Sequence, residues 1–289
     1  MNPKKFELLG DPVSHSKSPA MHRAAYEALR LPHSYEARRV SALDLEACVE
    51  HLRNGNINGY NITVPHKIDI LRFVDSVDES AKLVGAGNTL VLTSGGVVAY
   101  NTDLKALADE VDALLCSGPG GSLESALVLG SGGAARAAVG ALALRLCAKQ
   151  IVIRARAFAT ADTAASFRDE LMARLGAQGS LATIVCEPLH PSKLDAHASV
   201  VIQATSAGME GASPGHDVAN AVAWDDVPKV AVALDVVYTP TRTPFLDQAR
   251  ARGLVAANGL GMLARQGAQA FELWLGIPPP LDVMRAAIM

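Results

Sequence analysis

The sequence has 289 residues, of which 49% are apolar and only 4% aromatic, and its formal net charge is −3. This length suffices for two domains or one large one, and the small net charge without a basic block argues against nucleic-acid binding. The four cysteines lie far apart without CxxC spacing, which argues against a disulfide framework and a zinc site. Because the first residues lack an apolar signal core and no run approaches the ~20 apolar residues of a membrane helix, we expect a cytoplasmic globular protein without a metal site.

Strand-like and helix-like segments alternate through the first hundred residues. Ser18 followed by Pro19 predicts the start of a helix with Ser18 as its N-cap, and Gly95-Gly96 predicts the turn of a hairpin. The predicted elements are strand 5–10, helix 18–30, a turn and strand within 31–40, helix 42–53, strand 57–64, helix 78–85 and hairpin 87–103. This alternation predicts a parallel or mixed sheet with helices on its faces.

The alternation resumes after a helix over 104–115 and a glycine-rich, linker-like stretch over 116–125. The later predicted elements are a strand running into a helix over 125–146, strands within 149–155, 181–187, 199–206 and 230–238, and helix from residue 257 to the end. The sequence therefore predicts an α/β protein with two lobes, in which the last helices could return to the first lobe.

The stretch YNITVPHK gathers three polar side chains at the end of one predicted strand. Side chains two apart share a face of a strand, so Ile62 and Val64 are expected to face the core, and Asn61 and Thr63 to point the other way. Lys67 follows directly after the strand. An arbitrary lysine is more commonly a surface residue, so this stretch alone leaves a functional site and a plain surface both open.

Other polar groups of the first hundred residues would suit a small acid. Ser14, Ser16 and Ser18 alternate just before a predicted helix N-terminus, where hydroxyl donors and the positive helix end could hold a carboxylate. Asn88 lies in GAGNT, and Asp103 lies in NTD at a predicted helix N-cap. Capping by Ser18 and Asp103 would explain both residues without any function.

The segment ALVLGSGGAARAA places a glycine cluster between an apolar strand and an alanine-rich helix. Gly130 at the strand end allows a tight turn, the next glycine lets the backbone approach a diphosphate, and the small Ala135 lets the helix pack on the sheet. A bare glycine triplet would be an ordinary turn, but the strand before it and the helix after it are the context of a dinucleotide fingerprint.

The end of the next strand, some ~20 residues on, is where such folds contact the adenosine ribose. An acidic side chain there would favour NAD, but Arg154 and Arg156 occupy this place. A guanidinium suits a ribose 2′-phosphate by charge and bidentate geometry. We therefore predict NADP as the cofactor, with two solvated arginines as the alternative interpretation.

Eight segments, taken in order, resemble the shikimate dehydrogenase family. They are SHSKSPAMH, NITVPHK, GAGNT, NTD, LGSGGAARA, QATSAGM, LDVVYTPTRTPFL and NGLGMLARQGAQAFELWLG. The resemblance covers about residues 7–276 and implies a mixed-sheet substrate domain (1–103, completed by helices 258–289) and a Rossmann-type NADP-binding domain (104–257), with a cleft between them. Family members interconvert 3-dehydroshikimate and shikimate in chorismate and aromatic amino acid biosynthesis, or act on quinate or aminoshikimate, with NADP(H) or NAD(H).

The resemblance also implies roles for individual residues. Lys67 and Asp103 would be the catalytic pair, in which the lysine ammonium hydrogen-bonds the developing alkoxide and delivers a proton. The substrate would be bound by Ser16, Ser18, Asn61, Thr63, Asn88, Tyr238 and Gln266. The cofactor would be bound by Gly130, Gly132, Gly133, Ala134, Arg154, Arg156, Thr205, Gly259 and Met262.

The sequence departs from the family pattern at two places. Arg154-Ala155-Arg156 stands where NADP-dependent members have Asn-Arg-Thr, and Ala159 takes the later basic position, which leaves NAD open as the cofactor. Ala106 replaces the usual glycine in the helix that follows NTD, where a methyl group could tighten the cleft or alter the substrate.

These departures favour a paralogue that acts on shikimate, quinate or aminoshikimate, and the Ser16/Ser18 pair favours shikimate over quinate. A dehydrogenase of an unrelated small acid is less favoured by the motifs. A non-catalytic ligand-sensing regulator is the alternative from another class, and it predicts loss of Lys67, of Asp103 or of the glycine loop, all of which are intact. Monomer and homodimer both remain open.

Overall fold

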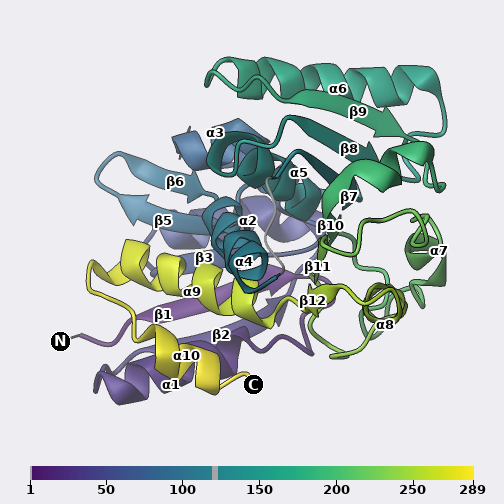
Figure 1. The fold of residues 1–289 in the computed structure, drawn as a ribbon. Helices are drawn as coiled ribbons and strands as arrows, with labels where there is room; N and C mark the ends of the chain where they lie inside the picture. The colour runs from purple at the N-terminus through teal and green to yellow at the C-terminus, as the bar shows by residue number, and fades with distance from the viewer. Residues whose placement is uncertain (1, 119–122) are drawn as a thin grey trace. The chain divides into compact units, whose positions relative to one another are not determined.

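The computed structural model describes residues 2–118 and 123–289, so residues 119–122 of the predicted linker lie outside the described residues. The chain divides into two compact units, Met1–Ala106 with Leu260–Met289, and Leu107–Gly259. Within the described residues each unit contains one six-stranded sheet (Figure 1). Helix α4 (Asp103–Ser117) carries the chain from the first unit into the second.

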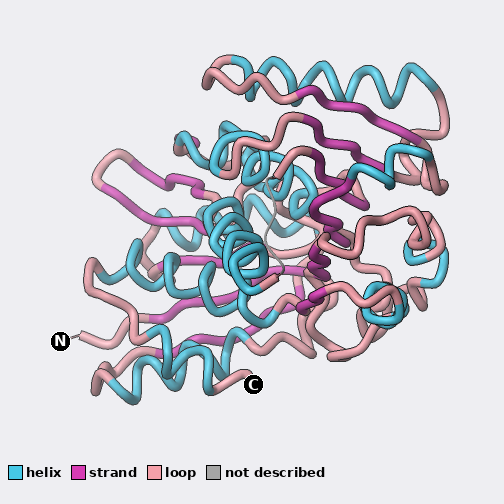
Figure 2. The backbone as a smooth tube through the Cα atoms, in the orientation of Figure 1, coloured by secondary structure: helices cyan, strands magenta, loops and turns pink. Residues whose placement is uncertain are grey.

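The first unit is built on a mixed sheet with the order β2-β1-β3-β5-β6-β4. Strand β1 pairs in parallel with β2 and β3, whereas β5 runs antiparallel to β3 and β6. The strands, magenta in Figure 2, are β1 (Lys5–Gly10), β2 (Ser34–Arg39), β3 (Gly59–Ile62), β4 (Ser76–Val77), β5 (Thr89–Thr93) and β6 (Gly96–Tyr100). The predicted hairpin is confirmed, since β5 and β6 pair with Thr93 opposite Gly96.

Helices cover this sheet through two separate apolar cores. They are α1 (Ser18–Ala28), α2 (Leu45–Arg53), α3 (Glu79–Val84), α9 (Leu260–Leu275) and α10 (Leu281–Ala286). Phe6 of β1 belongs to the core with α1 and the C-terminal helices, and Leu9 to the core with α2, as strand alternation requires. Trp274 of α9 stacks on Phe6 with ring centroids 4.6 Å apart and donates its Nε1–H to the Leu90 carbonyl at 3.0 Å, which fastens the last long helix to the sheet.

The second unit is built on a parallel sheet with the order β12-β11-β10-β7-β8-β9. All its neighbouring strands are parallel. The strands are β7 (Ser125–Leu129), β8 (Gln150–Arg154), β9 (Thr183–Glu187), β10 (Ala198–Gln203), β11 (Val232–Asp235) and β12 (Val255–Ala257). The α-helices of this unit include α5 (Gly133–Gly140), α6 (Ala161–Gly176), α7 (His216–Ala219) and α8 (Pro244–Ala251). Numbered within the unit, the order 3-2-1-4-5-6 is that of the Rossmann fold, as the sequence predicts.

Three local predictions are wrong. Strand β3 ends at Ile62 and the chain turns at once, so Val64 does not continue the alternation into the core and is 43% exposed. Helix α1 begins at Ser18, and its N-cap is Lys17 rather than Ser18. The C-terminal segment is not helical throughout, because β12 precedes α9, and residues 276–280 separate α9 from α10.

Candidate active site

The first unit contains an ion pair between Lys67, in the turn after β3, and Asp103, the first residue of α4. Lys67 Nζ donates to Asp103 Oδ2 at 2.6 Å, and the two side chains are 14% and 3% exposed. The backbone N–H of Gly87 donates to the Lys67 carbonyl at 2.7 Å and fixes the turn. An ammonium has three N–H groups and this bond uses one, so the pair can hold the lysine and still present N–H to a ligand.

Asp103 is not the N-cap of α4, contrary to the prediction. The N–H of Leu104 donates instead to Asn101 Oδ1 at 3.0 Å, and Asn101 Nδ2 donates to the Ala86 carbonyl at 2.8 Å. Because the Asn101 amide accepts at the start of the helix, the carboxylate of Asp103 is available to Lys67. The sequence analysis did not single out Asn101, although Asn is among the preferred capping residues.

Asn88 and Gln266 lie together in the first unit although 178 positions separate them. Asn88 Nδ2 donates to Gln266 Oε1 at 3.4 Å and to Thr102 Oγ1 at 2.9 Å, and Asn88 Oδ1 accepts from the Thr102 N–H at 2.8 Å. Gln266 also donates to the Leu263 carbonyl, one turn earlier in α9, at 3.0 Å. Thr102 thus belongs to this polar cluster, and its place beside Asp103 is the sequence signal that could have identified it.

Asn61 lies next to this cluster, and its amide is engaged inside the protein. Asn61 Oδ1 accepts from the hydroxyl of Tyr35 at 2.8 Å, while Nδ2 donates to the Asn88 carbonyl and to Thr89 Oγ1. Thr63 is half-buried and packs on the end of β1, where a Cβ on Gly10 would meet its Cγ2 at 2.3 Å. Both side chains therefore support the strand ends, and a ligand hydroxyl would reach Asn61 only by sharing or displacing an internal bond.

The two serines at the start of α1, Ser16 and Ser18, have different environments. Ser18 is buried as the first helical residue, and Ser16 Oγ accepts from the Ser18 N–H at 3.2 Å. Ser16 therefore accepts from the first N–H of the helix, and Ser18 does not cap it. Neighbouring Lys17 turns toward the C-terminus of the chain and donates to the Ile288 carbonyl at 2.6 Å.

The glycine loop of the second unit leaves open space at a helix N-terminus. Gly130, at the end of β7, has a φ of +120°, and a Cβ there would lie 2.9 Å from Thr205 Cγ2 and 3.0 Å from the Ala204 carbonyl oxygen. Gly132, the N-cap of α5, has open space where a side chain would be. Gly133 and Ala134 begin α5, so the open space at Gly132 lies beside backbone N–H groups of a helix N-terminus, an arrangement that suits an anion such as a diphosphate.

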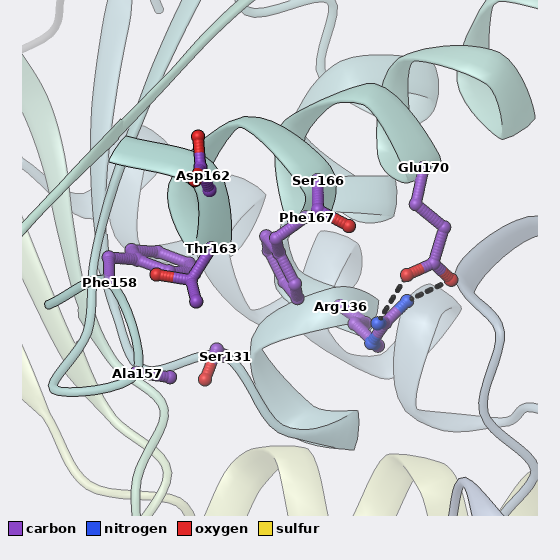
Figure 3. Close-up of a pocket in the computed structure, with 9 residues that line it drawn as sticks. All are labelled: Ser131, Arg136, Ala157, Phe158, Asp162, Thr163, Ser166, Phe167 and Glu170. Carbon is purple, nitrogen blue, oxygen red and sulfur yellow. Dashed lines mark hydrogen bonds and ion pairs between the residues drawn. The ribbon is translucent and has the colours of Figure 1, made fainter. Parts of the chain in front are cut away.

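A pocket of about 470 Å³ lies beside this loop (Figure 3). It is lined by Ser131, Arg136, Ala157, Phe158, Asp162, Thr163, Ser166, Phe167 and Glu170. Arg136 of α5 donates two bonds of 2.8 Å to the Glu170 carboxylate and lies 4.8 Å from the centre of the Phe167 ring. These bonds hold the pKa of Glu170 below its usual value. The sequence analysis missed Arg136, a charged residue within a buried alanine-rich helix.

The prediction that Arg154 binds the cofactor is contradicted by its burial. Its side chain is 0% exposed, and its guanidinium donates to Glu187 Oε2 at 3.0 Å, to Asp195 Oδ2 at 2.9 Å and to the Ala221 carbonyl at 2.9 Å. These internal acceptors face Arg154 because it is the last residue of β8 and its side chain points into the unit. Arg156, two residues later, is exposed and remains the candidate for a 2′-phosphate.

The remaining predicted residues lie in both units. Thr205, Tyr238 and Gly259 follow the carboxyl ends of β10, β11 and β12, which are neighbouring parallel strands of the second unit. Ligands of open α/β sheets bind outside such carboxyl ends. Met262 lies in α9 of the first unit and is buried.

Comparison with known proteins identifies the family of the chain. Residues 8–90 match the model of the shikimate dehydrogenase substrate binding domain, and residues 259–289 match that of the shikimate 5′-dehydrogenase C-terminal domain. A shikimate dehydrogenase (NADP+) of Nitrosopumilus maritimus is 32% identical over 286 residues, which cover 99% of this chain and 98% of that protein. The chain belongs to the shikimate dehydrogenase family.

Solved structures of the family have the same fold. A shikimate dehydrogenase in complex with NADP+ superposes with a TM-score of 0.83 and 33% identity, covering 99% of this chain and 94% of the other. The enzyme of Thermus thermophilus, in complex with NADP(H) and shikimate, superposes with a TM-score of 0.79 and 34% identity, covering 99% of this chain and 98% of the other.

Proteins of other activity resemble the chain at lower identity. They are a 5-ketofructose reductase of Gluconobacter sp. strain CHM43 and a quinate dehydrogenase of Corynebacterium glutamicum in complex with NAD, each with a TM-score of 0.81 and 28% identity, covering 99% or more of this chain and 98% or more of theirs. The fold alone therefore does not fix the substrate. In the described part of the chain, no helix has the length and hydrophobicity needed to cross a membrane.

Proposed function

We propose that this protein is a shikimate dehydrogenase, which transfers a hydride between NADP(H) and C3 of shikimate and 3-dehydroshikimate. The observation that carries the proposal is the ion pair of Lys67 and Asp103, with its 2.6 Å separation and partial burial. Family membership and the related structures that hold NADP and shikimate support it.

Lys67 is the general acid and base of the proposed reaction. When NADPH is bound it supplies the hydride for the ring carbonyl carbon, and the carbonyl oxygen then needs a proton. The ammonium of Lys67 donates a hydrogen bond to that oxygen and delivers the proton. In the oxidative direction the same Nζ takes the hydroxyl proton. Asp103 holds Nζ in place, so that the ammonium does not need to be oriented at the moment of reaction.

Polar side chains of the first unit would hold the ring. Ser16 and Ser18, at the start of α1, are proposed to bind the substrate carboxylate, where the helix N-terminus favours an anion. Asn88 and Gln266 would bind ring hydroxyls, and their weak mutual contact of 3.4 Å is easily exchanged for bonds to a ligand. Asn61 and Thr63 complete this set in the proposal, as does Tyr238 near the carboxylate.

NADP is the proposed cofactor, and the second unit would hold it. Gly130, Gly132, Gly133 and Ala134 would receive the diphosphate, and the pocket beside Ser131 suits the adenosine end. Thr205, Gly259 and Met262 are proposed as further contacts. Arg156, rather than the buried Arg154, would meet the 2′-phosphate, because it is exposed and a guanidinium binds phosphate in bidentate geometry.

We further propose that the protein acts in the cytoplasm as a monomer or a homodimer, without nucleic acid. The formal net charge of −3 supports the last point, because nucleic-acid binding draws on basic patches.

Initial rates for six substrate–cofactor pairs test the proposal. Shikimate, quinate and aminoshikimate are each offered with NADP and with NAD. The proposal predicts the highest kcat/KM for shikimate with NADP. The highest value for quinate with NAD would move the protein toward the quinate dehydrogenase that it also resembles. Tight shikimate binding without turnover in any of the six pairs would contradict an enzyme and indicate a sensing protein.

A further inference from the structure

One buried carboxylate of the second unit joins the segments that follow two neighbouring strands. Asp235 is the last residue of β11 and is 0% exposed. Its Oδ1 accepts from the Val237 N–H at 2.9 Å and from Gln203 Nε2 at 3.2 Å, and its Oδ2 accepts from Thr243 Oγ1 at 2.5 Å. These three partners are neutral, so the carboxylate is held by hydrogen bonds without a counter-ion among them.

Gln203 extends this network to the segment after β10. Its Oε1 accepts from the Thr205 N–H at 2.5 Å, and its Nε2 donates to the Thr205 and Ala207 carbonyls at 3.3 and 3.0 Å. The backbone of Thr205 is therefore bonded on both sides by the amide that Asp235 orients. Thr205 also packs closely on the glycine loop, since a Cβ on Gly130 would meet Thr205 Cγ2 at 2.9 Å.

Thr243 extends the network to the far end of the segment after β11. Its Oγ1 caps α8 by accepting from the Leu246 N–H while it donates to Asp235. The carboxylate thus holds the segment that contains Tyr238 both near its start, at Val237, and at its end, at Thr243. Residues 210 and 239 add a backbone bond of 3.1 Å between the two segments.

The segment after β12 contacts the segment that follows β11. The N–H of Gly259 donates to the Val237 carbonyl at 3.2 Å, and a Cβ on Gly259 would lie 2.1 Å from the Val236 carbonyl oxygen. Only a glycine fits this close to Val236, and its N–H is bonded to Val237, so Gly259 contacts the two residues that directly follow Asp235.

We propose that Asp235 is a positioning residue of the reaction, which sets the places of Thr205, Tyr238 and Gly259 through Gln203, Val237 and Thr243. The proposal rests on the proposed function, because those three residues are the proposed ligand contacts at the carboxyl ends of β10, β11 and β12. Asp235 itself touches neither substrate nor cofactor. Its loss weakens the binding of both ligands together, which loss of one contact residue would not do.

The test compares Asp235→Ala with Asp235→Asn and with Val152→Ala. The asparagine keeps an oxygen for Val237 and Gln203 and gains an N–H for Thr243 Oγ1, whereas the alanine removes every bond. Val152 is a buried core residue of β8, and its truncation lowers stability without touching the network. Steady-state rates are measured with shikimate and NADP as the varied ligands, at a temperature at which circular dichroism shows each variant to be fully native.

We expect Asp235→Ala to raise the KM for both shikimate and NADP by roughly tenfold or more, with a smaller change in kcat, as for a loss of binding alone. Asp235→Asn is expected to recover most of this loss, and Val152→Ala to leave both KM values unchanged. If Asp235→Ala does not fold, Thr243→Val removes one of the three bonds and is expected to raise both KM values to a smaller extent.

Native Asp235→Ala or Thr243→Val protein with wild-type KM values for both ligands would overturn the proposal and leave Asp235 a purely structural residue. An increase in both KM values for Val152→Ala would overturn it equally, since any loss of stability would then have the same effect. Absence of shikimate turnover in the wild type is a different result, which contradicts the proposed function itself.

Discussion

Two cation–carboxylate pairs near strand ends, one in each unit, differ in their access to solvent. The Lys67–Asp103 pair is 14% and 3% exposed, and one hydrogen bond joins it. The Arg154–Asp195 pair is 0% and 1% exposed, and Glu187 and the Ala221 carbonyl also accept from the arginine. A sealed guanidinium with several acceptors cannot meet a ligand, whereas a partly exposed ammonium with one acceptor can. The first pair is therefore suited to chemistry and the second to holding the fold.

The largest expected effect is loss of turnover when the first pair is broken. Lys67→Ala removes the proposed proton donor, and general acid–base catalysis contributes about 10²–10⁴-fold. We expect kcat for shikimate oxidation to fall by that factor. Removal of the cation also leaves the Asp103 carboxylate, which is 3% exposed, without its partner and lowers stability, so the rates are measured at a temperature at which the variant is fully native. Lys149→Ala, which breaks the exposed pair with Glu124, is the matched control and should keep wild-type turnover. A Lys67→Ala variant with wild-type kcat would show that the Lys67–Asp103 pair does not take part in the reaction.

Breaking the second pair should have the opposite result. Arg154→Met leaves Asp195 buried without its cation, and such a loss costs about 3–5 kcal/mol of stability. Denaturant unfolding measures this cost, with Arg168→Met, at an exposed pair with Asp169, as the control. The ratio of the KM values for NADP and NAD should not change in Arg154→Met protein that remains native. A selective loss of NADP binding would show that Arg154 does reach the cofactor.

Burial of a carboxylate also predicts a pH dependence in the second unit. Burial raises the pKa of Asp235 to about 7 from an ordinary value of 3.8, so the folded protein holds a proton that the unfolded chain has released. This contribution to stability is present at low pH and is lost as the pH rises from about 4 to about 7, by at most about 4 kcal/mol. Burial lowers the pKa of His22 to about 3 from an ordinary value of 6.5. The contribution of His22 to stability is therefore present above pH 6.5 and is lost as the pH falls from 6.5 to about 3.

The difference between wild type and Asp235→Asn isolates the Asp235 contribution, because His22 is present in both. Urea unfolding at several pH values should show the wild type losing stability relative to the variant between pH 4 and pH 7. A difference that stays constant across this range would mean that Asp235 titrates at an ordinary value in the folded protein.

The smallest expected effect concerns cofactor choice. Arg156→Ala should raise the KM for NADP by roughly tenfold, a loss comparable to about 1.4 kcal/mol, and leave the KM for NAD nearly unchanged, since only NADP carries the 2′-phosphate. Steady-state kinetics with both cofactors measure this. Equal changes for the two cofactors would place the 2′-phosphate elsewhere, and Arg136 in the neighbouring pocket would be the next residue to test.

The sequence predicted those features that depend on local pattern. Strand alternation up to Ile62, the hairpin around Gly95-Gly96 and the strand–glycine–helix context of Gly130 all follow from neighbouring residues, and each is confirmed. The order of the parallel strands does not follow from this alternation; it is the order of the Rossmann fold, which the resemblance to the family implies.

The sequence could not predict features that depend on distant partners. The burial of Arg154 requires Asp195, 41 positions away, and the Asp235 network requires Gln203, 32 positions away. Capping also failed locally, since Asn101 rather than Asp103 accepts the N–H of Leu104. Asn and Asp are both preferred capping residues, so the sequence does not show which of Asn101 and Asp103 accepts at the helix start. The structure shows that Asp103 pairs with Lys67 instead.

The most direct test of the account is the shikimate affinity of the Lys67→Ala variant, measured by calorimetry without cofactor and beside the wild type, so that neither protein turns the substrate over. The account predicts a Kd within about tenfold of the wild-type value alongside the loss of turnover, because the serines and amides bind the substrate and the lysine acts on the transition state. A loss of affinity as large as the loss of turnover would contradict it, and would make Lys67 a binding residue rather than the proton donor.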